Sequence, residues 1–144
     1  VFKSRRGARD EARQVFVQAA RVTDGWAGCD AYTVLELGFG LGVNFLHTVE
    51  AWQRDPRRSR RLFYVGVEAH PVSCGDLVKA LQALDCLDLP DEVGRAAQQL
   101  AAQWPMALPG IHRLEFCEGR VQLLLAFGDA AAMLRDVVNL MPGH

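Results

Sequence analysis

The 144-residue sequence contains no apolar stretch long enough to cross a bilayer, and nothing in it resembles a secretory signal. Its four cysteines include no CxxC pair, the spacing found in many metal and redox sites. The sequence therefore indicates neither a membrane-spanning protein nor a secreted domain held by disulfides. We expect reduced thiols, a cytoplasmic protein and no membrane partner.

The patterns of several catalytic and metal sites are also missing. None of the four histidines has a second ligand at metal-binding spacing, so no metal is predicted. No serine or cysteine lies in a nucleophile elbow. There are no repeats and no low-complexity tracts. A chain of this length is expected to form one α/β domain over residues 1–144.

An excess of positive charge is absent too, since the formal net charge is -1, and no global electrostatic argument favours a polyanion partner. The basic residues are nevertheless clustered. The first cluster lies near the start of the chain, at Lys3, Arg5, Arg6, Arg9 and Arg13. The second consists of Arg54, Arg57, Arg58, Arg60 and Arg61. A solvated loop and a binding patch both account for the second cluster, and neither cluster alone establishes nucleic-acid binding.

What the sequence does contain is a glycine-rich turn at residues 36–42, between a strand-like run and a helix-like run. A dinucleotide-binding loop has the spacing GxGxxG, whereas here the glycines follow GxGxG and Glu36 precedes the first of them by two positions. A carboxylate there would repel a pyrophosphate and suit a cationic ligand. The pattern resembles motif I of the class I S-adenosylmethionine-dependent methyltransferases. It favours adenosylmethionine over NAD, although a strand, glycines and a distal acid are also compatible with an NAD-dependent dehydrogenase.

Hydrophobic periodicity predicts the remaining elements. We expect helices over residues 10–20, 43–53, 72–87, 91–103 and 130–140, and a buried strand over 62–67. The segments 111–117 and 121–127 predict a β-hairpin around Gly119. The three tryptophans are dispersed and are expected in the core. The pattern is that of an α/β fold, with parallel strands, flanking helices and one hairpin.

Three carboxylates, Glu36, Glu68 and Asp129, fall at or just past predicted strand ends, which in a parallel sheet form the ligand-binding edge. Glu68 is expected to accept the hydroxyls of a ribose, the alternative being a surface turn residue. Asp129 could accept from an adenine amino group, cap the following helix, or do both. Asn44 is either a polar residue at a helix start or a contact for the methionine end of the cofactor. The predicted cofactor-binding residues are Glu36, Gly38, Phe39, Gly40, Gly42, Asn44, Glu68 and Asp129.

Several segments carry a resemblance to one family: Phe2, Ser4, Glu11 and residues 15–16, 35–46, 67–71, 103–105, 110–114, 119–121 and 127–130. Together they resemble the methyltransferase domain of the bifunctional tRNA 5-methylaminomethyl-2-thiouridine biosynthesis protein MnmC and its stand-alone relatives. The resemblance implies a partial class I, Rossmann-like methyltransferase sheet. It also implies transfer of a methyl group from adenosylmethionine to the aminomethyl group of a modified wobble uridine in tRNA. FAD is expected only if an oxidase domain follows in the parent protein.

In that family, the next strand ends in an Asp-Gly-Phe-x-Pro segment that lines the target-base pocket, and the sequence stops at His144 without it. We therefore expect a C-terminally incomplete domain with unidentified catalytic residues. In the usual strand order, the missing strand would pair with the first strand, so self-association through that exposed edge is expected. The alternative is a catalytically inactive module that keeps the fold and binds RNA or a protein through its arginine-rich segments.

Overall fold

The computed structural model describes residues 25–140. The helix predicted over 10–20 and the first basic cluster lie outside the described residues. The elements, in chain order, are β1 (Ala31–Leu37), α3 (Val43–Arg54), β2 (Arg61–Glu68), α4 (Cys74–Ala83), α5 (Glu92–Gln103), β3 (Gly110–Phe116), the short 3-10 helix η1 (Cys117–Gly119), β4 (Val121–Phe127) and α6 (Ala130–Leu140).

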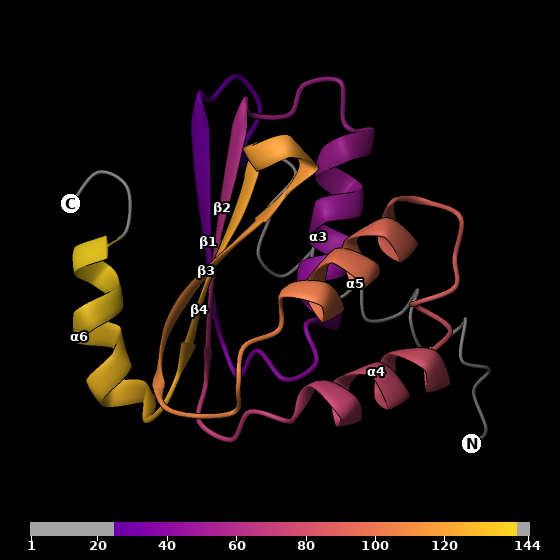
Figure 1. Ribbon diagram of the computed structural model, residues 1–144. Coiled ribbons are helices and arrows are strands. Elements are labelled where there is room, and N and C mark those ends of the chain that lie inside the picture. The colour runs from indigo at the N-terminus through magenta and orange to yellow at the C-terminus, as the bar shows by residue number, and fades with distance from the viewer. Residues whose placement is uncertain (1–24, 141–144) are drawn as a thin grey trace, which may run out of the picture.

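The four described strands form one sheet in the order β1-β2-β4-β3. β1, β2 and β4 run parallel, and β3 pairs antiparallel with β4. The parallel strands and the hairpin are thus as the sequence predicts. Because these three strands are parallel, the carboxyl ends of β1, β2 and β4 meet at one edge of the sheet, where the loop after β1 also lies (Figure 1).

The helix predicted over 72–87 is too long, because α4 covers only Cys74–Ala83. It begins where Ser73 accepts a hydrogen bond from the backbone of Asp76 at 3.2 Å, an N-cap that fixes the first turn. Its last residue is Ala83 and Leu84 is its C-cap; Asp85 then has a φ of 56°, a left-handed conformation that a right-handed helix cannot include.

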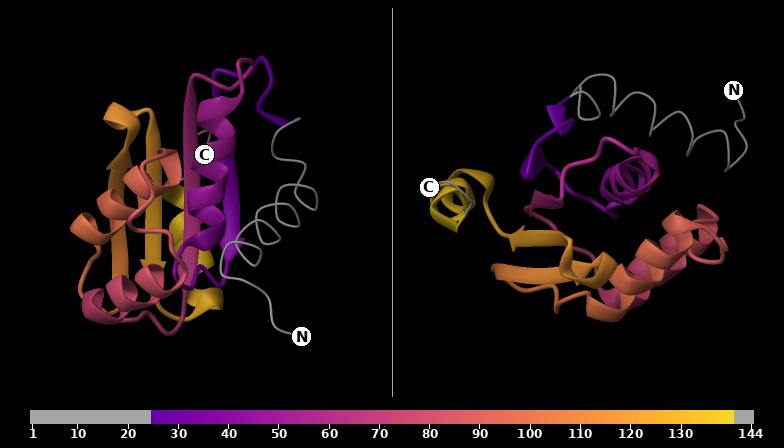
Figure 2. Two further views of the ribbon diagram at one scale, coloured as in Figure 1. Left: turned by 90° about the vertical axis from the view of Figure 1, so that its right-hand side faces the viewer. Right: turned by 90° about the horizontal axis from the view of Figure 1, so that it is seen from above.

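The helices form two layers around the sheet. α3, α4 and α5 cover one face, and α6 covers the other, as the views in Figure 2 show. The larger core lies under the three helices and contains the described tryptophans, Trp26, Trp52 and Trp104, at 0%, 1% and 8% exposure. Their predicted place in the core is confirmed. A smaller cluster, with Val65, Val67, Ala126 and Val137 at its centre, packs under α6.

β1 forms an edge of the sheet, since in the described part of the chain it pairs only with β2. Leu35 and Leu37 pair with Val65 and Val67, so they point to the face that α6 covers. The single helix does not reach across them: Leu35 is 45% exposed and Leu37 is 57% exposed. Among residues 25–140, the outer edge of β1 is therefore open, as predicted, and apolar side chains lie along it.

Candidate functional site

The glycine loop, residues 38–42, leaves β1 and crosses the end of β2. The backbone N–H groups of Gly38 and Phe39 both donate to the carbonyl of Val67, at 2.8 and 3.0 Å. Gly40 has a φ of 62°, and Gly38 and Gly42 are also in the left-handed region. A Cβ added at Gly38 or Gly40 would meet nothing within 4 Å. Backbone at these two positions therefore faces open space at the carboxyl edge of the sheet.

Phe39 anchors the loop from below. Its side chain is 3% exposed and stacks on Trp104, with ring centroids 6.3 Å apart and an interplanar angle of 27°. The ring occupies the place that a side chain at Gly66 of β2 would need, since a Cβ there would collide with it. Phe39, one of the predicted cofactor-binding residues, can therefore contact a ligand only through its backbone.

Glu36 lies at the carboxyl end of β1 and is 9% exposed. Its carboxylate accepts hydrogen bonds from the amide of Asn44 and from the hydroxyl of Tyr64, both at 2.8 Å. Burial raises the pKa of Glu36, the two hydrogen bonds act in the opposite direction, and the charge of Glu68 raises it further. No Lys, Arg or His within residues 25–140 forms an ion pair with this carboxylate.

Asn44, in the first turn of α3, thus has an intramolecular role that the sequence did not predict: it holds the Glu36 carboxylate at 2.8 Å. Tyr64 was not among the predicted site residues. It lies in the middle of an apolar strand, and its hydroxyl group was the one available signal that this position needs a buried hydrogen-bond partner.

Glu68, the last residue of β2, joins the glycine loop to the end of the strand. One carboxylate oxygen accepts from the backbone N–H of Gly40 at 2.7 Å, and the other accepts from that of His70 at 3.0 Å. Glu68 is therefore more than a surface turn residue. Each carboxylate oxygen can accept a further hydrogen bond, so two donors do not exhaust its capacity.

Asp129 follows β4 and caps α6, accepting from the backbone N–H of Ala132 at 3.1 Å. The side chain remains exposed. Just before it, the N–H of Gly128 donates to the carbonyl of Glu68 at 2.9 Å, which fixes the end of β4 beside that of β2. The capping role predicted for Asp129 is thus observed, whereas its contact with an adenine stays a prediction.

The loop between α5 and β3 also borders this edge, because the start of β3 pairs with the end of β4. Met106 and Leu108 in this loop are 76% and 57% exposed. Their exposure is not visible in the sequence, since an isolated exposed apolar residue has no sequence signal. They expose apolar side chains in the loop that leads into β3.

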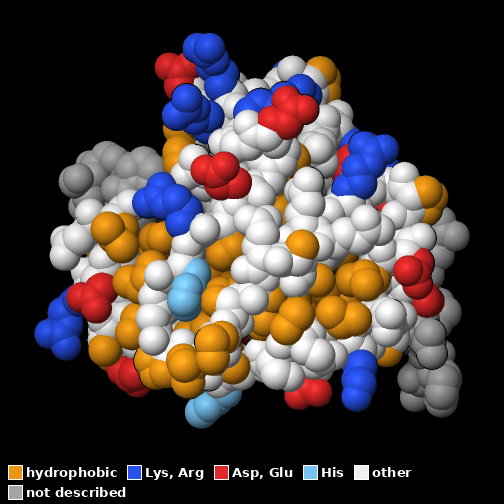
Figure 3. Space-filling view, viewed as in Figure 1, with side chains coloured by type: hydrophobic (Ala, Val, Ile, Leu, Met, Phe, Trp, Pro, Cys, Tyr) orange, Lys and Arg blue, Asp and Glu red, His pale blue; other side chains and the backbone are white. Residues whose placement is uncertain are grey.

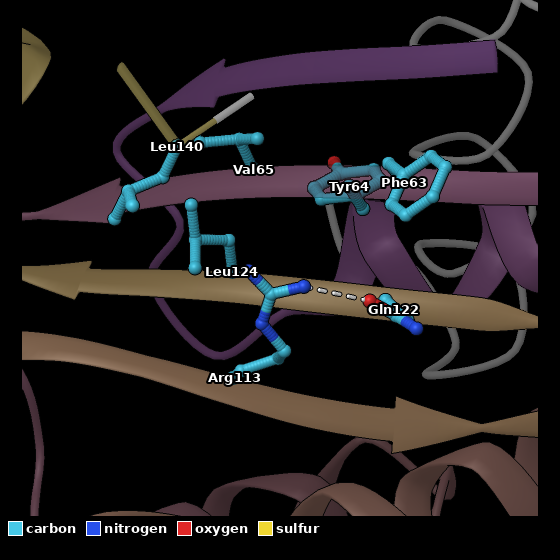
Figure 4. Close-up of a pocket in the computed structure, with 7 residues that line it drawn as sticks. All are labelled: Phe63, Tyr64, Val65, Arg113, Gln122, Leu124 and Leu140. Carbon is cyan, nitrogen blue, oxygen red and sulfur yellow. Dashed lines mark hydrogen bonds between the residues drawn. The ribbon is translucent and has the colours of Figure 1, made fainter. Parts of the chain in front are cut away.

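Other features of the described residues lie away from this edge. Figure 4 shows a pocket over the middle of the strands, where Leu140 of α6 faces β2 and β4 and Arg113 donates to Gln122 at 3.0 Å. This pocket contains none of the predicted site residues. In residues 25–140, no cluster of three or more His, Cys, Asp or Glu could hold a metal ion. No helix in this range has the length and apolar character needed to span a membrane.

A parallel α/β sheet with a glycine loop between β1 and α3, and with carboxylates at the adjoining strand ends, defines the Rossmann-like class of α/β proteins. The crystal structure of MNMC2 from Aquifex aeolicus has the same fold. It aligns with a TM-score of 0.61 and 21% sequence identity, over 90% of this chain and 36% of that one.

Sequence comparison gives closer similarities than the structure does. The chain is 48% identical over 134 residues to the tRNA 5-methylaminomethyl-2-thiouridine biosynthesis bifunctional protein MnmC of Paraburkholderia phytofirmans, covering 93% of this chain and 20% of the relative. It is 45% identical to the protein of the same name from Polaromonas sp., covering 94% and 20%. No family model matches the chain. The chain is thus similar to MnmC proteins over nearly all of its own length, and it spans 20% of the length of these relatives.

Proposed function

We propose that this chain binds S-adenosylmethionine at the glycine loop and forms part of a tRNA methyltransferase. Its expected reaction is methylation of the aminomethyl group of a modified wobble uridine. The names of the relatives support action on tRNA. The observation that carries the cofactor assignment is Glu36, a buried carboxyl without a cationic partner in residues 25–140, beside a loop whose backbone faces open space.

The residues present suit the cofactor. Backbone around Gly38 and Gly40 is open to a ligand, as a close approach requires. Glu68 has acceptor capacity left for ribose hydroxyls, and Asp129 is exposed at the next strand end. Glu36 would face the amino end of the methionine moiety, where a positive charge would compensate the burial of its own negative charge. When bound, the cofactor supplies an activated methyl group.

The expected contribution of these residues to the reaction is positioning. Methyl transfer needs a neutral amine held in line with the methyl group, and orientation of two partners supplies a large part of the rate enhancement. The loop is well suited to this, because Phe39 fixes it to the core and Glu68 fixes it to β2. The residue that accepts the proton from the amine is not among those we assign.

Calorimetry with S-adenosylhomocysteine tests the cofactor assignment. Gly40→Val places a β-branched residue at a φ of 62° and is expected to weaken binding by at least about tenfold. The matched control is Gly75→Ala, in the first turn of α4, where an added Cβ has its nearest neighbour at 4.0 Å. A wild-type chain that binds NAD but not S-adenosylhomocysteine would overturn the proposal in favour of a dehydrogenase.

A further inference from the structure

A group of arginines lies at the end of the sheet opposite to the glycine loop. Arg58 and Arg60 come from the connection between α3 and β2, Arg61 is the first residue of β2, and Arg120 comes from the turn before β4. The fold brings them together because β2 and β4 are neighbours: the N–H of Leu62 donates to the carbonyl of Arg120 at 2.9 Å. We call these four residues the arginine patch. Arg120 is distant in sequence from the other three, so the basic clusters seen along the sequence did not include it.

The four side chains surround two adjoining hollows. Arg60, Arg61 and Arg120 line one of them, and Arg58, Arg60 and Arg120 line the other. Arg60 and Arg120 belong to both. All four residues are exposed. In Figure 3, Lys and Arg side chains gather at the upper end of the molecule, with some acidic side chains among them.

The patch is held in shape by Trp52, a buried residue of α3. The guanidinium groups of Arg58 and Arg120 lie over its ring, 5.2 and 5.8 Å from the centroid. The indole N–H donates to Ser59 at 3.1 Å, and Ser59 in turn donates to the carbonyl of Arg61 at 2.9 Å. The connection is therefore anchored on both sides of Arg60, which lowers the entropy cost of binding a ligand there.

Charge in the patch is poorly compensated. Among residues 25–140, Asp30 is the one carboxylate that lines either hollow, against four arginines. Asp55 lies outside both hollows, but its pKa is lowered chiefly by the hydrogen bond from Trp26, and the charge of Arg58 contributes to this lowering. Arg58 also donates to the carbonyls of Gln53 and Asp55, and Arg120 donates to that of Cys117, so these two have structural roles as well. The side chains of Arg60 and Arg61 make no hydrogen bond or ion pair with any residue in the range 25–140.

We propose that the arginine patch binds the phosphate backbone of RNA. Guanidinium groups match phosphate oxygens in charge and in geometry, and a cluster in which arginines outnumber carboxylates favours a polyanion. The choice of RNA over an acidic protein rests on the proposed function. β2 has 8 residues, so the patch lies roughly 25 Å from the glycine loop. It would hold a part of the RNA distant from the base that is modified.

Fluorescence anisotropy with labelled unmodified tRNA, measured over a series of salt concentrations, tests the patch. The double variant Arg60→Ala, Arg61→Ala should bind tRNA about tenfold more weakly at low salt. The slope of the logarithm of the association constant against the logarithm of the salt concentration should become less negative by about one to two. The matched control is Arg95→Ala with Arg135→Ala, two exposed arginines of α5 and α6. Arg60→Lys with Arg61→Lys keeps the charge and should retain most of the affinity.

Two results would overturn the proposal. One is equal tRNA binding by the alanine pair and its control. The other is a loss of binding to polyglutamate but not to tRNA, which would make the patch a site for an acidic protein. Calorimetry with S-adenosylhomocysteine on the same variants separates the two proposals: the alanine pair should bind it as the wild type does. If the wild type fails to bind it while the patch still binds tRNA, only the cofactor assignment fails.

Discussion

The carboxylate of Glu68 accepts a 2.7 Å hydrogen bond from the backbone N–H of Gly40, across the carboxyl ends of β1 and β2. The residue expected to bind a ribose therefore also shapes the loop expected to bind the rest of the cofactor. A ligand that binds here meets an acceptor already held in place by two backbone donors. Loop geometry and ligand recognition are not independent at this residue.

Glu68→Gln separates the two roles. The amide oxygen can still accept from Gly40, so the loop should keep its shape, and the free energy of unfolding should fall by less than about 1 kcal/mol. The charge and one acceptor oxygen are lost, so affinity for S-adenosylhomocysteine should fall about tenfold. Calorimetry and urea denaturation measure the two quantities. Glu115→Gln, on an exposed position of β3, is the control, and equal affinities for the two variants would contradict the ribose role.

Gly66→Ala tests the anchoring of the loop. The added methyl group would collide with the Phe39 ring, and overpacking of this kind costs about 1–3 kcal/mol in the free energy of unfolding. Gly75→Ala, at an open helical position, should instead be neutral or stabilise the chain by up to about 1 kcal/mol. Urea denaturation of both variants gives the comparison. A Gly66→Ala chain as stable as the wild type would show that the ring moves aside at no cost.

The buried Glu36 predicts a pH dependence of stability. Its pKa lies above the ordinary value of 4.5, chiefly because of burial. The folded state then binds more protons than the unfolded chain between the two pKa values, so stability falls as pH rises through that window. The contribution of the protonated group is fully present below pH 4.5 and is lost above the folded pKa.

Urea denaturation from pH 4.5 to 8 of the wild type and of Glu36→Gln measures this effect. The amide is neutral at every pH, and its two ends can serve Tyr64 and a reoriented Asn44. The stability of the wild type relative to the variant should therefore decline as pH rises. Asp136→Asn, at an exposed position of α6, is the control. A difference that increases with pH would mean that the folded state favours the charged carboxylate.

The open edge of β1 predicts self-association of this chain. On the side of β1 that faces away from β2, the backbone groups have no partner strand among residues 25–140, and Leu35 and Leu37 expose apolar surface beside them. Leu35→Lys should shift association to concentrations about tenfold higher, because a charged side chain opposes pairing of two edges. Sedimentation velocity over a range of concentrations measures this. Leu108→Lys, an exposed leucine away from β1, is the control. A wild type that stays monomeric throughout would refute the prediction.

The elements that follow local rules were predictable from the sequence. The glycine turn fixes the junction of β1 and α3, and Gly119 lies in the turn of the hairpin. The end of α4 was not predictable, because the left-handed Asp85 has no sequence signature comparable to a glycine or a proline. Sequence order also conceals partners that only tertiary structure creates, such as Tyr64 for Glu36 and Arg120 for the patch.

The site shows the same limit. Which carboxylates gather at the sheet edge follows from the parallel topology, and this part of the prediction needed only the strand ends. Which groups already bind those carboxylates depends on side-chain packing. Asn44, in the first turn of α3, donates to Glu36 at the end of β1, and spacing along the chain does not encode this contact.

The way the Phe39 ring fills the space left by the missing side chain of Gly66 links two positions that are far apart in the chain. The two residues share one fixed volume, so we expect them to vary together among related sequences. A larger residue at position 66 should be found with a smaller one at position 39. In this chain, Phe39→Leu should restore part of the stability that Gly66→Ala removes. Gly66 of β2 would then be needed for the packing of the glycine loop as well as for the sheet.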